Sequence, residues 1–336
     1  MTVKKGWSKL EALKNIAMFS ETENRSLLRK RWLDLLGEPS FVRSDCPPAA
    51  YMVEETSLDG FDASLWKQTT EPGHQQTLIL LRPHKLSSSL APCAVIPFYH
   101  PEPSAGLMPD AGKNGLKSDP DNSLEKAMRQ YGRHLVERGF VVLCTEAFPF
   151  NTVPDPGGDP FAWWGAAAEK IQRNHPRWTG LGKLVHDTQC AISLLLRQPC
   201  VDATRLLLMG HSLGGKMAFY TGALDERVTA VIASDFGLPW DSTNWDAPWY
   251  LGEKRPAATS DFNHEKLLAL LAPRPFFLIS GEADSVKSWE MMRNAQTYYA
   301  LYDKTELLTG FDHASGHTPT PKSLDAAFQW LETVFA

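Results

Sequence analysis

The chain has 336 residues, of which 43% are apolar and 22% are charged, and its formal net charge at pH 7 is −5. This length and composition are typical of one large globular domain with insertions, and they disfavour extended disorder. Because a weakly acidic chain carries no basic field that would hold a polyanion, we expect no nucleic-acid partner.

The first residues, MTVKKGWSKLEALKNIAMF, lack the uninterrupted apolar stretch and the small-residue cleavage site of a secretory signal. No segment approaches the roughly 18 apolar residues of a membrane-spanning helix. Five cysteines with no C-x-x-C pair favour free thiols, and no H-E-x-x-H, P-loop or G-x-G-x-x-G motif follows a predicted strand. We therefore expect a cytoplasmic protein with no membrane partner, metal or cofactor, and the oligomeric state stays open.

Residues 1–48 are predicted to form a helical N-terminal extension. Large apolar residues recur there at spacings that place them on one helix face. They are Leu27, Leu28, Trp32, Leu35 and Leu36. From residue 50 to residue 98, four β-like runs separated by Gly, Pro, Asp and Ser predict antiparallel strands that lead into a sheet. These runs are YMVEETS, ASLWKQTT, QTLILLRP and CAVIPFY.

After residue 100, predicted helices and strands alternate to the end of the chain. The first helix is expected from the N-cap Ser123 to Gly139, and the last is KSLDAAFQWLETVF. This alternation predicts an α/β domain over residues 49–336, with a mainly parallel sheet, right-handed crossovers and flanking helices. Two insertions, at about 147–180 and 235–262, follow strands, where loops of parallel sheets build binding sites.

The segment LLLMGHSLGGK, residues 206–216, contains G-x-S-x-G between a predicted strand and a predicted helix. A serine lifted out of such a tight turn needs small neighbours, which Gly210 and Gly214 supply. We predict that Ser212 is a nucleophile rather than an ordinary turn serine. Lys216, one turn further on, is expected to be a packing or supporting residue rather than a base.

A serine nucleophile needs an imidazole base, and the base needs a carboxylate that orients it. Where the nucleophile lies on such a strand–turn–helix connection, the order expected along the chain is serine, then acid, then histidine. Asp284 lies in a turn just past a predicted strand, LISGEADS, and is the expected acid. Glu282 in the same loop is the main alternative. Asp235, which follows the strand before, is a less favoured candidate for the acid, and we expect it to cap a loop.

Two histidines precede the final predicted helix. His317 follows a glycine and lies close to the helix start, whereas His313 is nearer the end of the strand. We predict that His317 is the base. The oxyanion that develops during attack needs preorganised backbone N–H donors. We expect these to be the N–H of Leu213 and that of Tyr99 or His100, which follow an earlier strand.

Together these segments resemble an α/β-hydrolase, and more narrowly the dienelactone hydrolase and acetyl xylan esterase-like branch, over about residues 27–336. The resemblance rests on RWLDLLGEPSF, GHSLGGK, LISGEADS and GHTPTPKSLDAAFQWLETVF. It implies a triad of Ser212, Asp284 and His317 and a small-molecule ester substrate. The chain has serine where dienelactone hydrolases use cysteine, and PFYH where a His-Gly oxyanion loop is common.

Four tryptophans in the two insertions are candidates for stacking on a sugar ring or an acyl group, with burial of a large loop as the alternative. They are Trp163, Trp164, Trp240 and Trp245. We therefore predict a serine carboxylic-ester hydrolase for short-acyl esters such as acetylated carbohydrates. A peptidase or amidase of the same fold, or a binding protein without activity, is the alternative.

Overall fold

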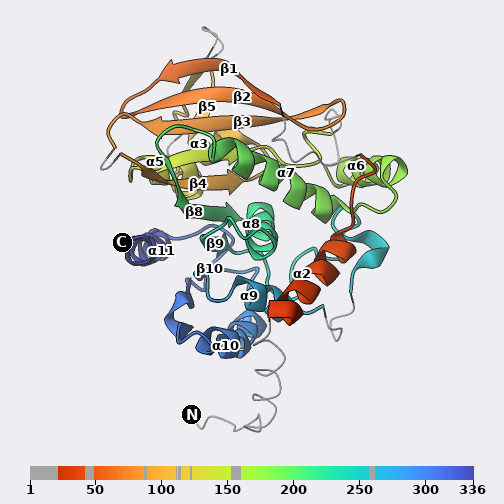
Figure 1. The fold of residues 1–336 in the computed structure, drawn as a ribbon. Helices are drawn as coiled ribbons and strands as arrows, with labels where there is room; N and C mark the ends of the chain where they lie inside the picture. Colours follow the sequence, from red (N-terminus) through yellow and green to blue (C-terminus); the bar gives the residue numbers. More distant parts are fainter. Residues whose placement is uncertain are drawn as a thin grey trace.

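The computed structural model describes residues 22–41, 49–86, 89–110, 112, 115–121, 123–152, 160–256 and 262–336. Its centre is a sheet of nine strands in the order β1-β2-β3-β7-β4-β8-β9-β10-β11 (Figure 1). The bounds of these strands are β1 Ala50–Ser57, β2 Phe61–Glu71, β3 His74–Pro83, β4 Ala91–Pro97, β7 Val141–Thr145, β8 Val201–His211, β9 Ala230–Ser234, β10 Phe276–Ser280 and β11 Leu308–Asp312.

The sheet is parallel from β7 to β11, and antiparallel among β1, β2, β3 and β7. The mainly parallel sheet predicted from the alternating pattern is therefore confirmed. The prediction that all four runs from 50 to 98 are antiparallel is wrong for the last run, CAVIPFY. Its strand β4 pairs in parallel with β7 and β8, because it begins the alternation of strands and helices.

Helices cover both faces of the sheet, which is why strands β7, β9 and β10 are buried from end to end. One face carries α7 Gly180–Leu195, α8 Leu213–Leu224, α9 His264–Leu271 and α10 Val286–Ala300, and the other carries α3 Pro101–Ala105, α5 Tyr131–Val136 and α11 Pro321–Val334. The remaining elements are α2 Thr22–Leu36, α4 Leu124–Arg129, α6 Pro160–Asn174, the small sheet β5 Leu107–Pro109 and β6 Leu116–Ser118, and the 3-10 turns Gly252–Lys254 and Thr305–Leu307.

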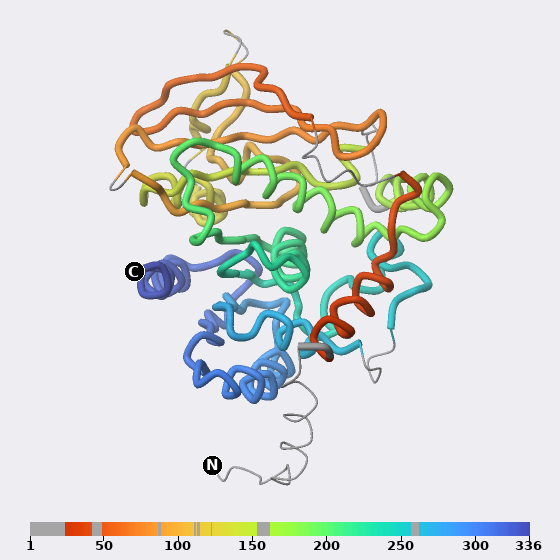
Figure 2. Tube along the Cα trace, in the orientation of Figure 1, coloured from red at the N-terminus to blue at the C-terminus, as the bar shows by residue number. Residues whose placement is uncertain are grey.

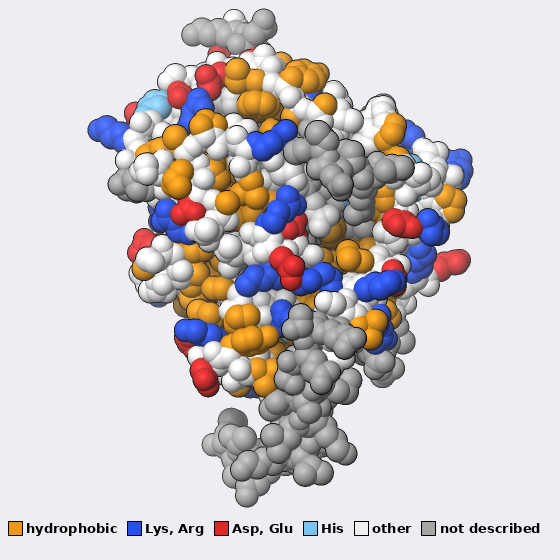
Figure 3. Space-filling view, viewed as in Figure 1, with side chains coloured by type: hydrophobic (Ala, Val, Ile, Leu, Met, Phe, Trp, Pro, Cys, Tyr) orange, Lys and Arg blue, Asp and Glu red, His pale blue; other side chains and the backbone are white. Residues whose placement is uncertain are grey.

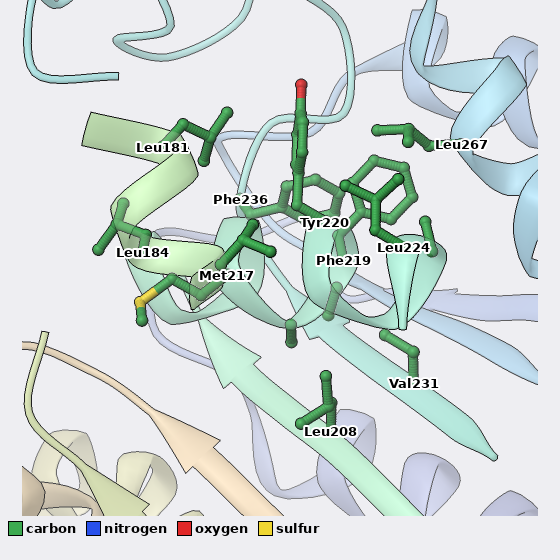
Figure 4. Packing of buried hydrophobic residues seen from close by; sticks show 14 of the residues in the cluster. Leu181, Leu184, Leu208, Met217, Phe219, Tyr220, Leu224, Val231, Phe236 and Leu267 are labelled. Atoms are coloured by element: carbon green, nitrogen blue, oxygen red, sulfur yellow. The ribbon is translucent and has the colours of Figure 1, made fainter. Parts of the chain in front are cut away.

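Helix α8, which directly follows the predicted nucleophile, is the most enclosed helix of the fold. Every residue of α8 is buried. Figure 4 shows Met217 and Tyr220 on this helix among leucines of α7 and α9, above Leu208 and Val231 of the sheet. Packing of this density on three sides fixes the helix, and with it the turn from β8 into α8.

Two local expectations differ from the structure. The single helix predicted from Ser123 to Gly139 is broken at Gln130, whose ψ of 54° ends α4 before α5 begins. Leu27 is 57% exposed, whereas Trp32 and Leu36 are buried, so the apolar face of α2 is narrower than predicted. The rest of the predicted extension, residues 1–21 and 42–48, lies outside the described residues.

Helix α2 packs against α7 and α9 and lies beside residues 235–256 in Figure 2. No helix in the described part of the chain combines the length and the apolar character that a bilayer span requires. On the face shown in Figure 3, basic and acidic side chains are interspersed, which corresponds to the small net charge of the chain.

Candidate active site

Ser212 sits on the sharp turn between the buried end of strand β8 and helix α8. Its backbone has φ 54° and ψ −114°, a region that side-chain-bearing residues rarely adopt. The turn is held by Ser212 N, which donates to Ser234 O at 2.8 Å. Such backbone strain, of the order of 1–3 kcal/mol, persists where the surrounding structure enforces it.

The glycines around Ser212 are required by close backbone approach. A Cβ on Gly210 would lie 2.1 Å from the carbonyl oxygen of Gly214, and a Cβ on Gly214 would lie 2.0 Å from that of Pro97. The second contact brings the carboxyl end of β4 directly against the turn. The G-x-S-x-G spacing is therefore a steric requirement of this strand–turn–helix connection.

His317 is paired with Asp235. Its Nδ1 donates to Oδ2 of Asp235 at 2.5 Å, and the Asp235 side chain is 0% exposed. The other carboxylate oxygen, Oδ1, accepts from the backbone N–H of Gly281 at 3.0 Å and of Ala283 at 2.8 Å. The carboxylate thus has three donors and a fixed orientation, and it leaves Nε2 of His317 for another partner.

The expected pairing of His317 with Asp284 is not what the structure contains. The Asp284 carboxylate accepts from the backbone N–H of Leu238 at 2.8 Å and of Gly237 at 3.4 Å, and from Oγ of Ser288 at 2.7 Å. Burial raises the pKa of Asp284. Asp284 therefore anchors the loop that follows β9, and the loop-capping role expected of Asp235 belongs to Asp284.

Glu282, the alternative acid, and His313, the alternative base, make other contacts. Glu282 is exposed, and its backbone N–H donates to Gly316 O. His313 places Nδ1 3.2 Å from Oγ of Ser315. Neither side chain pairs with His317.

His211 lies against His317, with ring centroids 4.5 Å apart. Its Nδ1 is 3.2 Å from Oγ of Ser234, and burial, reinforced by the neighbouring His317, holds the pKa of His211 well below its usual range. A neutral imidazole at this position packs against His317 without adding a positive charge.

Ser212 and His317 line one pocket of about 780 Å³. Among the described residues, Ser212 Oγ has no hydrogen-bond partner. In enzymes without bound substrate, the hydrogen bond between nucleophile and base is often long and tightens only when substrate binds. Most of the lining is polar or charged. The other lining residues are Lys216, Phe236, Asp241, Ser242, Thr243, Asn244, Glu282, Ala283, Ser285 and Lys287.

Lys216 has a larger part in this pocket than the sequence suggested. Its side chain is 3% exposed, and Nζ donates to Oδ1 of Asn244 at 2.7 Å and to Oγ1 of Thr243 at 3.1 Å. Nζ also lies 4.6 Å from the ring centroid of Trp245. Burial lowers the pKa of Lys216 to about 7. Lys216 therefore ties helix α8 to the second insertion at the floor of the pocket.

The end of β4 presents the candidates for a second oxyanion donor. Phe98 N donates to Thr145 O at 3.3 Å, and Tyr99 O accepts from Ala147 N at 3.3 Å. The N–H groups of Tyr99 and His100 have no backbone acceptor among the described residues. Both follow the strand that contacts the Ser212 turn through Gly214.

The four tryptophans expected to contact substrate are buried instead. Trp163, Trp164, Trp240 and Trp245 are at most 6% exposed, and none of them lines the Ser212 pocket. In the second insertion the indole N–H groups donate to backbone carbonyls, Trp240 to Phe262 O at 2.7 Å and Trp245 to Gly237 O at 2.6 Å. The structure therefore brings none of these four rings into the Ser212 pocket; they are buried, and Trp240 also lines a neighbouring pocket.

The second half of the chain is similar to one known protein family. Residues 179–336 match the model of the prolyl oligopeptidase family. These residues contain Ser212, Asp235, Asp284 and His317. YtaP of Bacillus subtilis (strain 168), a protein that bears the name of a hydrolase, is 23% identical over 77% of this chain and 84% of its own length.

Solved structures share the fold over almost the whole chain. A glucuronoyl esterase from Solibacter usitatus has a TM-score of 0.70 at 14% identity, and covers 94% of this chain and 93% of its own. A promiscuous CE15 esterase from a marine bacterial metagenome has a TM-score of 0.65 at 15% identity, covering 93% of this chain and 91% of its own. The predicted α/β-hydrolase fold is confirmed.

Proposed function

We propose that this α/β-hydrolase is a serine carboxylic-ester hydrolase whose catalytic residues are Ser212, His317 and Asp235. Ser212 Oγ attacks the ester carbonyl carbon while His317 Nε2 takes its proton. The tetrahedral intermediate collapses, and the leaving alcohol takes that proton as the C–O bond breaks. Water then attacks the acyl-enzyme with His317 as base, which releases the acid and restores the Ser212 hydroxyl.

The observation that carries this proposal is the contact of His317 Nδ1 with Asp235 Oδ2 at 2.5 Å, beside a strained serine in the same pocket. The contact fixes the proton of neutral His317 on Nδ1, so Nε2 is the basic nitrogen. The buried carboxylate also stabilises the imidazolium that forms during attack. Removing Asp235 would leave a serine without an oriented base.

The oxyanion is proposed to bind the N–H groups of Leu213 and His100. Leu213 directly follows the nucleophile at the start of α8. In a trans peptide the C=O and N–H point in opposite directions, and Tyr99 O is turned toward Ala147, which follows β7. The N–H of His100 therefore points away from β7, and β8, which leads to Ser212, lies on the other side of β4. This geometry favours His100 over Tyr99.

Short-acyl esters of polar alcohols, such as acetylated carbohydrates, are the proposed substrates. Most residues that line the Ser212 pocket carry a hydroxyl, amide, imidazole or charged group, and Phe236 and Ala283 are its apolar members. Such a lining suits a hydroxyl-rich alcohol better than a long acyl chain. The structurally similar proteins named above are esterases, which supports an ester as the substrate.

The direct test is hydrolysis of p-nitrophenyl acetate by the Ser212→Ala variant. We expect a loss of kcat of about 10⁴-fold or more, and loss of labelling by a fluorophosphonate probe. The matched control is Ser242→Ala, which removes a hydroxyl from the same pocket; Ser242 Oγ donates to Pro239 O. Full activity of Ser212→Ala would overturn the proposal.

A peptide hydrolase is the second candidate, because the matching family model describes the prolyl oligopeptidase family. The same residues would attack an amide, and the difference lies in protonating an amine leaving group. A panel of matched acetyl esters and acetyl amides distinguishes the two. The ester proposal predicts a clear preference for the esters, whereas faster cleavage of the amides would favour a peptidase.

A further inference from the structure

A second pocket adjoins the Ser212 pocket along helix α10. It has a volume of about 260 Å³. Two side chains, Asp241 and Lys287, line both pockets, so the second pocket begins where the first ends. Its other lining residues are Pro239, Trp240, Asn263, Glu265, Glu290, Met291 and Asn294.

One face of α10 runs through both pockets. Ser285, the N-cap of α10, and Lys287 line the Ser212 pocket, and Lys287, Glu290 and Asn294 line the second one. Positions 287, 290, 291 and 294 are three or four residues apart, which places them on one side of the helix. A ligand extending from Ser212 along this face therefore meets the polar side chains of Lys287, Glu290 and Asn294, with the apolar Met291 beside them.

The chemistry of the second pocket suits a neutral ligand rich in hydroxyl groups. Glu265 and Glu290 supply carboxylate acceptors, and Asn263 and Asn294 supply amides that both donate and accept. Asn294 Nδ2 already donates to Glu265 Oε1 at 3.0 Å, which holds both groups in place. Three carboxylates against one lysine make the lining acidic, so an anionic ligand is disfavoured.

The boundary between the pockets is an ion pair between Lys287 and Asp241. Both side chains are largely exposed. An exposed pair of this kind contributes only about 0–1 kcal/mol, so its members can turn toward a ligand at little cost. The boundary therefore adds two polar partners without sealing the second pocket.

We propose that the ester substrate spans both pockets, with the ester at Ser212 and a neutral polyhydroxylated unit, such as a second sugar ring, along α10. This inference rests on the proposed ester hydrolase function. It makes Asn294 and Glu290 residues that determine substrate length, at a distance from the reacting atoms.

The test compares kcat/KM for a mono-O-acetylated methyl xyloside and for the matched mono-O-acetylated methyl xylobioside. We expect the wild-type protein to prefer the disaccharide ester by about tenfold or more. In the Asn294→Ala and Glu290→Ala double variant, the ratio of the two values should fall toward one. Because both substrates are measured on the same protein, a change in the fraction of folded enzyme cancels in the ratio.

Arg293→Ala is the matched control, since Arg293 is an exposed residue of the same helix and lines neither pocket. It should keep the wild-type ratio. Equal values for the two esters on an active wild-type enzyme, or an unchanged ratio in the double variant, would overturn this inference alone. Absence of hydrolysis of any ester, p-nitrophenyl acetate included, would overturn the proposed function as well.

Discussion

His317 Nδ1 lies 2.5 Å from Oδ2 of Asp235, the residue directly after β9. It does not pair with Asp284, the carboxylate that follows β10. Asp235 has φ 42°, which turns its side chain at once out of the buried strand. Backbone N–H groups of Gly281 and Ala283, just after β10, hold its second oxygen. The loop after β10 therefore supports the acid through its backbone, while the side chain comes from the neighbouring strand.

The fit of Gly214 against Pro97 predicts a large effect of the Gly214→Ala change. The added Cβ would lie 2.0 Å from the Pro97 carbonyl oxygen, a backbone atom that is fixed in β4. We expect a loss of stability of roughly 1–3 kcal/mol, typical of overpacking, and a lower kcat because the turn must shift. Urea unfolding and p-nitrophenyl acetate kinetics measure the two effects.

Gly165→Ala is the control for this change. Gly165 is also a helix glycine, but a Cβ there meets nothing within 4 Å. Replacement should stabilise α6 by about 0.5–1 kcal/mol through helix propensity. A Gly214→Ala variant as stable and as active as Gly165→Ala would contradict the steric account of the turn.

Lys216 predicts a specific pH dependence of stability. Burial lowers the pKa of Lys216 to about 7, against 10.5 for an ordinary lysine, so the unfolded chain binds more protons between these values. The free energy of unfolding should therefore rise with pH from about 7 to 10.5, by up to about 1.4 kcal/mol per pH unit from this group. Below pH 7 the cost of burying the charge is fully present.

Urea unfolding of the wild-type protein and of Lys216→Met across this pH range isolates the effect. The difference between the two free energies should grow with pH in favour of the wild-type protein. If the free energies of unfolding of the two proteins changed with pH in parallel, Lys216 would have the same pKa in the folded and unfolded states, which would contradict this prediction.

Trp245→Phe tests the structural role of the insertion tryptophans. The variant keeps an aromatic ring but loses the indole N–H that donates to Gly237 O at 2.6 Å in a buried position. Leaving that carbonyl without a donor should cost about 1–3 kcal/mol of stability. The KM for p-nitrophenyl acetate should stay unchanged, whereas a large rise in KM with unchanged stability would indicate direct substrate contact.

Much of the fold could be predicted because its signals are local. The alternation of apolar strands and amphipathic helices predicted the parallel sheet, and the glycines around Ser212 predicted the turn, since both depend on residues adjacent in sequence. The antiparallel expectation for β4 was wrong because strand direction depends on which strands become neighbours, and β4 pairs with β7 and β8 from later in the chain.

The acid could not be chosen from the sequence, because Asp235 and Asp284 both follow strands. What separates them is the path of their loops in space: Asp284 faces the backbone of Gly237 and Leu238, and Asp235 faces His317. A positive φ at Asp235 has no reliable sequence signal. The tryptophans are likewise typical of a binding loop, and only the structure shows that the four rings are buried and lie outside the Ser212 pocket.

The most direct test of the proposed triad compares Asp235→Asn with Asp284→Asn in kcat/KM for p-nitrophenyl acetate. We expect Asp235→Asn to lose about 10³–10⁴-fold, because asparagine cannot hold His317 in the required tautomer or stabilise its charge. Asp284→Asn keeps a side-chain acceptor for the loop after β9 and should lose less than about tenfold, with a lower melting temperature. Near-wild-type activity of Asp235→Asn together with a 10³-fold loss in Asp284→Asn would contradict the account.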